Sequence, residues 1–259
     1  MIIHREGSDE MAIDRKALVY RNHPVIRKIE PLSPFSLGNG SLGFSADVTG
    51  LQSFQEAYEI PLGTQSHWGW HSTGGRDKYK LGDNRLQMLD TYGRQVPYPL
   101  WPEDKEEEHH WLRQNPHRLQ LGYIGFRFLN EDGSLVKPEQ LEAIEQELNL
   151  WEGILYSSYR VNGKPVQVET CVNPDADQIA VKVKSPWIEE GKLQLFVKFP
   201  GPDMIARGWD KAIFPDWDNE DRHQTKVEAQ TANSVLVNRS MDDDGYEMRW
   251  NWSAGSLTQ

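Results

Sequence analysis

The sequence predicts a mainly β protein, a large antiparallel β-sandwich with one or two short helices. Three observations support this fold class. Apolar and polar residues alternate with a period of two through much of the second half of the chain. Turn-forming residues separate the alternating runs at short intervals. A single segment has helical spacing of its apolar residues, so we expect residues 1–259 to form one β-sandwich domain that carries one packed helix.

The most regular runs lie between residues 123 and 173. Residues 153–173 predict a hairpin, because Asn162-Gly163 suits a tight turn with positive φ. On its second strand these residues share one face: Val166, Val168, Thr170 and Val172. In the preceding run these residues share a face before a polar turn: Ile124, Phe126 and Phe128. Further strands are predicted at 178–185, 192–199, 234–240 and 245–252.

The predicted helix covers residues 137–153. Pro138 suits a first helical turn, and acidic residues follow where the helix dipole favours them. An apolar stripe at helical spacing is formed by Leu141, Ile144, Leu148 and Trp151. Residues 69–115 show neither pattern and are rich in Gly, Pro and charge. We expect long ordered loops there, which in compact domains are often functional.

The bulk composition excludes some partners. The formal net charge of -11 argues against DNA, RNA and anionic membranes, which need surplus Lys and Arg. No apolar run approaches a membrane span, and the first residues lack the hydrophobic core of a signal peptide. The protein is expected to be cytoplasmic, or periplasmic if a leader is missing. Cys171 is the only cysteine, so no internal disulfide can form.

The glycine-rich stretch Gly38–Gly43 has the spacing of a dinucleotide-binding loop. No strand–loop–helix unit surrounds it, and residues 44–54 resemble a strand. We therefore interpret the stretch as a tight turn between two strands. No cofactor is predicted.

Motifs for metal binding and for a serine nucleophile are weak. His67 and His71 are four residues apart, but Gly69 breaks any helix between them and no Glu follows the first His. Residues 242–245, Asp-Asp-Asp-Gly, lack the remaining ligands of a calcium loop and predict an exposed turn. No Gly-x-Ser-x-Gly motif is present. We predict no metal site.

Carboxylates near aromatic residues are candidates for glycosidic chemistry. They are Asp47, Glu56, Glu59 and Glu152. A glycosidase needs two such groups on either side of the sugar bond, at a separation that sequence does not show. For each of the four we expect a surface or capping role, because acids are common on protein surfaces.

The segment Gln-Ser-His-Trp-Gly-Trp-His-Ser, residues 65–72, combines aromatic faces with hydrogen-bonding groups. Such a combination suits neutral, polyhydroxylated rings such as sugars. The predicted substrate-binding residues are Gln65, His67, Trp68, Trp70 and His71. The alternative is that the tryptophans only cover the core. No catalytic residue is assigned.

Four segments in this order resemble the N-terminal region of bacterial six-hairpin glycoside hydrolases. They are residues 33–54, 60–72, 148–170 and 175–186. The resemblance is to proteins related to family 65, and a shorter glycine element is shared with family 95 fucosidases. It implies a galactose-mutarotase-like β-supersandwich followed by an (α/α)6 barrel that carries the catalytic carboxylates. No such barrel can be recognised in this chain, so no catalytic residue is carried over.

Three functions are therefore considered. The first is a non-catalytic accessory domain that supports the sugar site of an (α/α)6 barrel in the same or a separate chain. The second is a stand-alone carbohydrate-binding module, and the third is a small enzyme with its own carboxylate pair. If a barrel normally covers one face, that exposed face would favour dimers or aggregates. A homo-oligomer is therefore possible.

Overall fold

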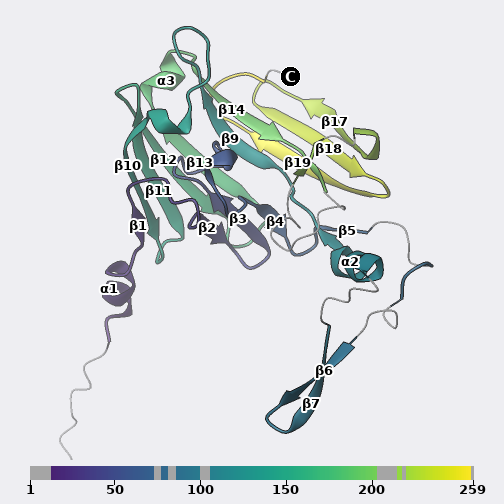
Figure 1. The fold of residues 1–259 in the computed structure, drawn as a ribbon. Helices are drawn as coiled ribbons and strands as arrows, with labels where there is room; N and C mark the ends of the chain where they lie inside the picture. The colour runs from purple at the N-terminus through teal and green to yellow at the C-terminus, as the bar shows by residue number, and fades with distance from the viewer. Residues whose placement is uncertain are drawn as a thin grey trace, which may run out of the picture.

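The computed structural model describes residues 13–72, 77–80, 86–99, 106–202, 215–217 and 220–257. In these residues every strand pairing is antiparallel, and the sheets pack as a mainly β sandwich (Figure 1). The predicted fold class is confirmed. The helices are short: α1 (Arg15–Tyr20), α2 (Glu106–Gln114) and α3 (Pro186–Glu189).

The largest sheet has five strands. In spatial order they are β1 (Val25–Ile26), β10 (Leu141–Asn149), β11 (Ile154–Val161), β12 (Lys164–Val172) and β13 (Ile179–Lys184). The predicted hairpin of residues 153–173 is β11–β12. Its turn has φ of 48° at Asn162 and 75° at Gly163, which confirms the expected tight turn.

Smaller sheets complete the fold. A three-stranded sheet contains β2 (Phe35–Gly38), β3 (Leu42–Ala46) and β4 (Thr64–Ser66). A second contains β17 (His223–Gln230), β18 (Ser234–Met241) and β19 (Asp244–Asn251). Between the large sheet and β17–β19 in Figure 1 lie the paired strands β9 (Tyr123–Phe128) and β14 (Leu193–Lys198). These ranges confirm strands predicted near residues 123, 192, 234 and 245.

The described residues also contain three two-stranded pairs and three short 3-10 turns. The pairs are β5 (Trp70–His71) with β8 (His117–Arg118), β6 (Leu86–Thr91) with β7 (Arg94–Pro99), and β15 (Gly201–Pro202) with β16 (Pro215–Asp216). The 3-10 turns are η1 (Gln55–Ala57), η3 (Pro138–Gln140) and η5 (Glu220–Arg222).

The helix predicted at 137–153 is wrong. Only its first turn is helical, as η3, and the rest is strand β10. A β-bulge at Ala143, where φ is 49°, shifts the register between Glu142 and Glu145. Before the bulge the inward-facing residue is Leu141. Because the bulge adds one residue, the even-numbered residues Ile144, Gln146 and Leu148 face inward after it. That change gives Leu141, Ile144 and Leu148 a spacing that imitates a helix.

The expectation of long loops at 69–115 is wrong where the structure describes this part. Strand β5, the hairpin β6–β7 and helix α2 all fall within it. Figure 1 shows β6–β7 extending away from the sandwich. Pro97 and Pro99 lie in β7. Strand patterns with proline are hard to recognise from sequence, because proline is disfavoured inside sheets.

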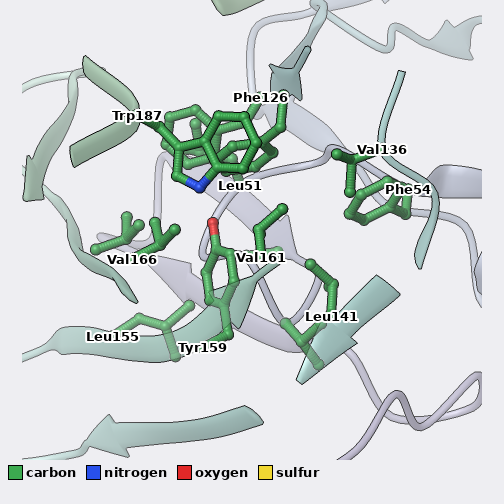
Figure 2. Close-up of a cluster of buried hydrophobic side chains, with 14 of the residues drawn as sticks. Leu51, Phe54, Phe126, Val136, Leu141, Leu155, Tyr159, Val161, Val166 and Trp187 are labelled. Atoms are coloured by element: carbon green, nitrogen blue, oxygen red, sulfur yellow. The ribbon is translucent and has the colours of Figure 1, made fainter. Parts of the chain in front are cut away.

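The main core lies between the five-stranded sheet and the strands that face it. It includes side chains from β2, β3, β9, β11 and β12, together with Trp187 of α3. Figure 2 shows Tyr159 pointing its hydroxyl toward Trp187. Phe128 meets the rings of both residues edge-on, at centroid distances of 6.2 Å from Tyr159 and 5.6 Å from Trp187. These aromatic pairs join the two layers and anchor α3.

The glycine stretch at 38–43 is a tight turn between β2 and β3, as predicted. Gly40 has φ of 90°, and the Asn39 side chain accepts hydrogen bonds from the backbone N–H groups of Ser41 and Leu42. The strand expected over residues 44–54 is correct only as far as Ala46. Beyond it, the chain turns back through the interior.

A buried loop, residues 47–52, runs between the layers. The Asp47 N–H donates to the Leu51 carbonyl at 2.7 Å, and the Gln52 N–H donates to Ile124 of β9 at 2.7 Å. From the large sheet, Gln146 Nε2 donates to the Asp47 carbonyl at 2.7 Å, and Thr170 Oγ1 donates to the Gly50 carbonyl at 2.8 Å. Backbone N–H and carbonyl groups of the loop, which water cannot reach, are thereby hydrogen-bonded to both layers.

Replacing Gly50 by Ala should destabilise the fold by about 2–4 kcal/mol. Gly50 has φ of 87°, and an added Cβ would lie 3.0 Å from both Ser157 Oγ and Val168 Cγ1. Gly163→Ala is the matched control, since Gly163 also has positive φ but has open space around it. Urea unfolding should show a loss of only about 1 kcal/mol for the control. Equal losses would show that packing at Gly50 is unimportant.

The hairpin β6–β7 should promote self-association. Its large apolar side chains are exposed, including Leu86, Met88, Leu89 and Tyr98. An isolated two-stranded hairpin is marginally stable in water, so covering these side chains is favourable. We expect light scattering to show association that grows with concentration and that weakens in the Met88→Ser, Leu89→Ser double variant. A monomer at every concentration would contradict this prediction.

Candidate functional site

The candidate site is the Trp loop, residues 65–71, which joins β4 to β5. Gln65 lies half-buried in β4, opposite Gly43 of β3. His67 is exposed, and its backbone N–H donates to Ser41 at 2.9 Å. Residues 67 and 68 form a tight turn after β4. Glycine fits at position 69, because an added Cβ there would lie 3.2 Å from Ser66 Oγ. The loop therefore starts from a fixed strand and turns sharply before β5.

Trp68 and Trp70 lie on the surface, with 46% and 41% of their area exposed. Both indole N–H groups have partners: Trp68 Nε1 donates to Asp177 Oδ2 at 2.6 Å, and Trp70 Nε1 donates to the His67 carbonyl at 2.8 Å. An exposed indole with a fixed N–H loses little conformational freedom when a ligand stacks on it. The two rings are therefore oriented in advance.

Each ring is also supported by another side chain. Tyr246 of β19 meets Trp68 edge-on, with centroids 6.1 Å apart. The Arg118 guanidinium lies 4.2 Å from the centroid of the Trp70 ring, and its Nη1 donates to the Ser66 carbonyl at 3.1 Å. Arg118 thus occupies one face of Trp70, as a cation–π partner.

His71 lies beneath the loop and is 1% exposed. Its Nδ1 is 2.7 Å from Asp244 Oδ2, and its Nε2 is 3.0 Å from Asp242 Oδ2. Arg222 Nη2 donates to the same oxygen of Asp242 at 2.7 Å. The Arg222 hydrogen bond, with a smaller contribution from His71, lowers the pKa of Asp242. These contacts form a polar chain from Arg222 through Asp242 and His71 to Asp244, and it joins β5 to the β18–β19 turn.

The five predicted binding residues are not equivalent in the structure. His67, Trp68 and Trp70 are exposed on one loop, and Gln65 is half-buried in β4. His71 faces inward, so its predicted contact with substrate does not agree with its burial. The reason is strand geometry: consecutive residues of β5 point to opposite sides, and Trp70 points outward.

Sequence reasoning missed the residues that hold this loop. They are Arg118, Asp177, Asp242, Asp244 and Tyr246. Residues 242 and 243 do form the predicted turn, between β18 and β19. Its acidic composition was the available signal, but only the fold brings that turn to the loop.

The four candidate carboxylates are far from equivalent. Asp47 is fully buried, so the expected surface position is wrong for it, whereas its side chain does cap backbone N–H groups. Its carboxylate accepts from the backbone N–H groups of Thr49 at 2.7 Å and Phe54 at 2.8 Å. Glu56, Glu59 and Glu152 are exposed, as expected. Glu152 accepts from the Tyr20 hydroxyl at 2.9 Å.

Burial raises the pKa of Asp47 to about 6, against the lowering effect of its hydrogen bonds to Thr49 and Phe54. The Asp47 carboxyl group stabilises the buried loop through these hydrogen bonds. It faces the core and no surface on which a substrate could bind.

Within the described ranges, no group of three or more His, Cys, Asp or Glu residues could hold a metal ion. In the same ranges, no helix has the length and apolar character needed to cross a bilayer. Comparison with known proteins finds no family model that matches this chain, and no curated protein with significant similarity to it.

The buried carboxyl of Asp47 should make stability depend on pH. The folded state raises its pKa from 3.8 to about 6, so the folded protein binds this proton more tightly than the unfolded chain. The free energy of unfolding should therefore fall by roughly 2–3 kcal/mol from this residue as pH rises through about 4 to 6.

Asp47→Asn removes that titration, so its unfolding free energy should vary less between pH 4 and 7 than that of the wild type. The change in pH dependence is the readout, since an Asn amide would also face the Phe54 N–H and lower stability at every pH. Glu56→Gln, at an exposed site, is the control. Parallel pH profiles for the wild type and Asp47→Asn would contradict the assignment.

Proposed function

We propose that this chain is a non-catalytic β-sandwich domain of a glycoside hydrolase, and that its Trp loop lines the sugar site. The observation that carries this proposal is the pair of exposed, anchored indoles at Trp68 and Trp70. The resemblance of residues 33–54, 148–170 and 175–186 to six-hairpin glycosidases supports it from outside the Trp loop. The catalytic carboxylates would then come from an (α/α)6 barrel in the same or another chain.

The chemistry of the loop suits a neutral sugar. Indole faces stack on the C–H faces of pyranose rings, and neighbouring polar groups bind the hydroxyls. The His67 carbonyl accepts from the Trp70 indole, and the Asp177 carboxylate accepts from the Trp68 indole. A chain of net charge -11 favours an uncharged ligand over an anionic one.

The carboxylates near the loop support an accessory role. Asp177 accepts from Trp68, while Asp242 and Asp244 both contact His71. These contacts hold the loop in place. A glycosidase pair instead needs two carboxyl groups directed at one glycosidic bond.

The Trp loop should bind sugar through stacking. We expect Trp68→Ala and Trp70→Ala each to weaken binding of maltotriose, cellotriose or methyl fucoside by about 2- to 12-fold, whichever of them the wild type binds. Calorimetry and chemical-shift perturbation on the 259-residue chain would measure this. In a polypeptide that includes the barrel, the same variants should change the Michaelis constant or the turnover.

Trp151→Ala is a matched control, because Trp151 is 48% exposed and lies on the β10–β11 turn, outside the Trp loop. It should leave binding unchanged. Equal binding by all the variants and the wild type would reject the Trp loop as the site.

The principal alternative is a stand-alone carbohydrate-binding module. Such a module should bind one of these sugars tightly as an isolated chain, whereas an accessory domain should bind weakly. Release of sugar from a nitrophenyl glycoside by the purified chain would instead favour a small enzyme with its own carboxylate pair.

A further inference from the structure

Trp70 and His71 are consecutive residues on opposite sides of strand β5. β5 has only two residues, and its pairing with β8 places Trp70 opposite Arg118 and His71 opposite His117. Trp70 faces solvent, so His71 faces the interior. A two-residue strand has few backbone bonds to stop it rotating. The His71 side chain, held at both ring nitrogens, supplies the missing constraint.

Both contacts of His71 come from the same short turn. Asp242 and Asp244 lie at the β18–β19 turn, 171 and 173 residues away along the chain. Asp244 and Tyr246 are two residues apart in β19, so their side chains lie on one face of that strand. That face therefore contacts both His71 and Trp68. The start of β19 therefore supports the Trp loop at Trp68 and at His71.

The protonation state of His71 decides how strong this support is. A carboxylate oxygen only accepts hydrogen bonds, so two ionised aspartates require both ring nitrogens to donate. That is the imidazolium form. When the ring loses a proton, one nitrogen presents a lone pair to a carboxylate at 3.0 Å or less. Attraction is then replaced by repulsion at one of the two contacts.

Charged and titratable groups from three elements surround His71. Asp242 and Asp244 face it from the β18–β19 turn, and Arg222 reaches Asp242 from η5. His117 lies opposite it on β8, next to Arg118. Because the pKa of Asp242 is lowered, chiefly by Arg222, that carboxylate remains ionised in mildly acidic solution. His71 Nε2 therefore faces an ionised carboxylate, and any loss of the ring proton acts on that contact or on the contact with Asp244.

We propose that His71, Asp242 and Asp244 form a pH-sensitive latch that positions the tryptophans of the Trp loop. The latch is closed when His71 is protonated and loosens as pH rises. His71 acts here as a positioning residue, since it is buried and touches no ligand surface. The consequence for sugar binding rests on the function proposed above, whereas the latch itself does not.

Asp244→Asn is the informative variant. An Asn side chain can accept from protonated His71 through its oxygen, or donate to neutral His71 through its amide. The contact therefore survives in both states of the ring. Asp243→Asn is the matched control, because Asp243 is an exposed neighbour in the same turn and loses the same charge. Asp242→Asn serves as a second variant if Asp244→Asn does not fold.

The primary measurement is nuclear magnetic resonance of the indole N–H groups of Trp68 and Trp70 between about pH 5.5 and 8.5. In the wild type and Asp243→Asn, both signals should shift or broaden at the pH where the His71 ring signal changes. In Asp244→Asn they should remain nearly constant. Sugar affinity should fall at least about threefold over the same range in the wild type, and much less in Asp244→Asn.

Two results would overturn the latch: indole signals of the wild type that do not change while His71 titrates, or the same profile in the wild type and Asp244→Asn. If the indole signals follow the latch but no sugar binds at any pH, the proposed function fails and the latch stands. If sugar binds with an affinity independent of pH and the indole signals are constant, the latch fails and the function stands.

Discussion

The buried loop of residues 47–52 joins the two β-layers of this protein through its backbone, and the Asp47 side chain fixes the shape of that loop. The loop runs between two β-layers, where no water can satisfy its backbone. Asp47 binds the N–H groups of Thr49 and Phe54, and its carbonyl accepts from Gln146 of the large sheet. Polar bonds thus connect the layers at the centre of an apolar core. The raised pKa of Asp47, about 6, reflects the cost of placing its charge there.

The surface that we propose for sugar binding also depends on contacts between segments that are distant in sequence. Trp68 and Trp70 are oriented by contacts with Asp177, Arg118 and Tyr246, all from other parts of the fold. Their exposed faces are useful for stacking only because these contacts hold them still. The site is therefore a property of the assembled sandwich, and the loop alone would not have it.

Local patterns predicted much of the fold. The alternation in β12 and the Asn-Gly turn before it are correct because both depend on residues near one another in sequence. The same reasoning failed at β10, where a bulge at Ala143 changed the side-chain phase and imitated a helix. Of the candidate site, the aromatic loop was found, whereas the burial of His71 was not.

The sequence by itself determined the faces of the β11–β12 hairpin, the glycine turn at residues 38–43 and a segment rich in Trp and His. These follow from side-chain periodicity and backbone freedom, which act over a few residues. Only the tertiary structure decided that Asp47 is buried and that His71 is held by two aspartates. Those aspartates lie more than 170 residues from His71. Contacts at that separation arise from packing of sheets, and no local pattern contains them.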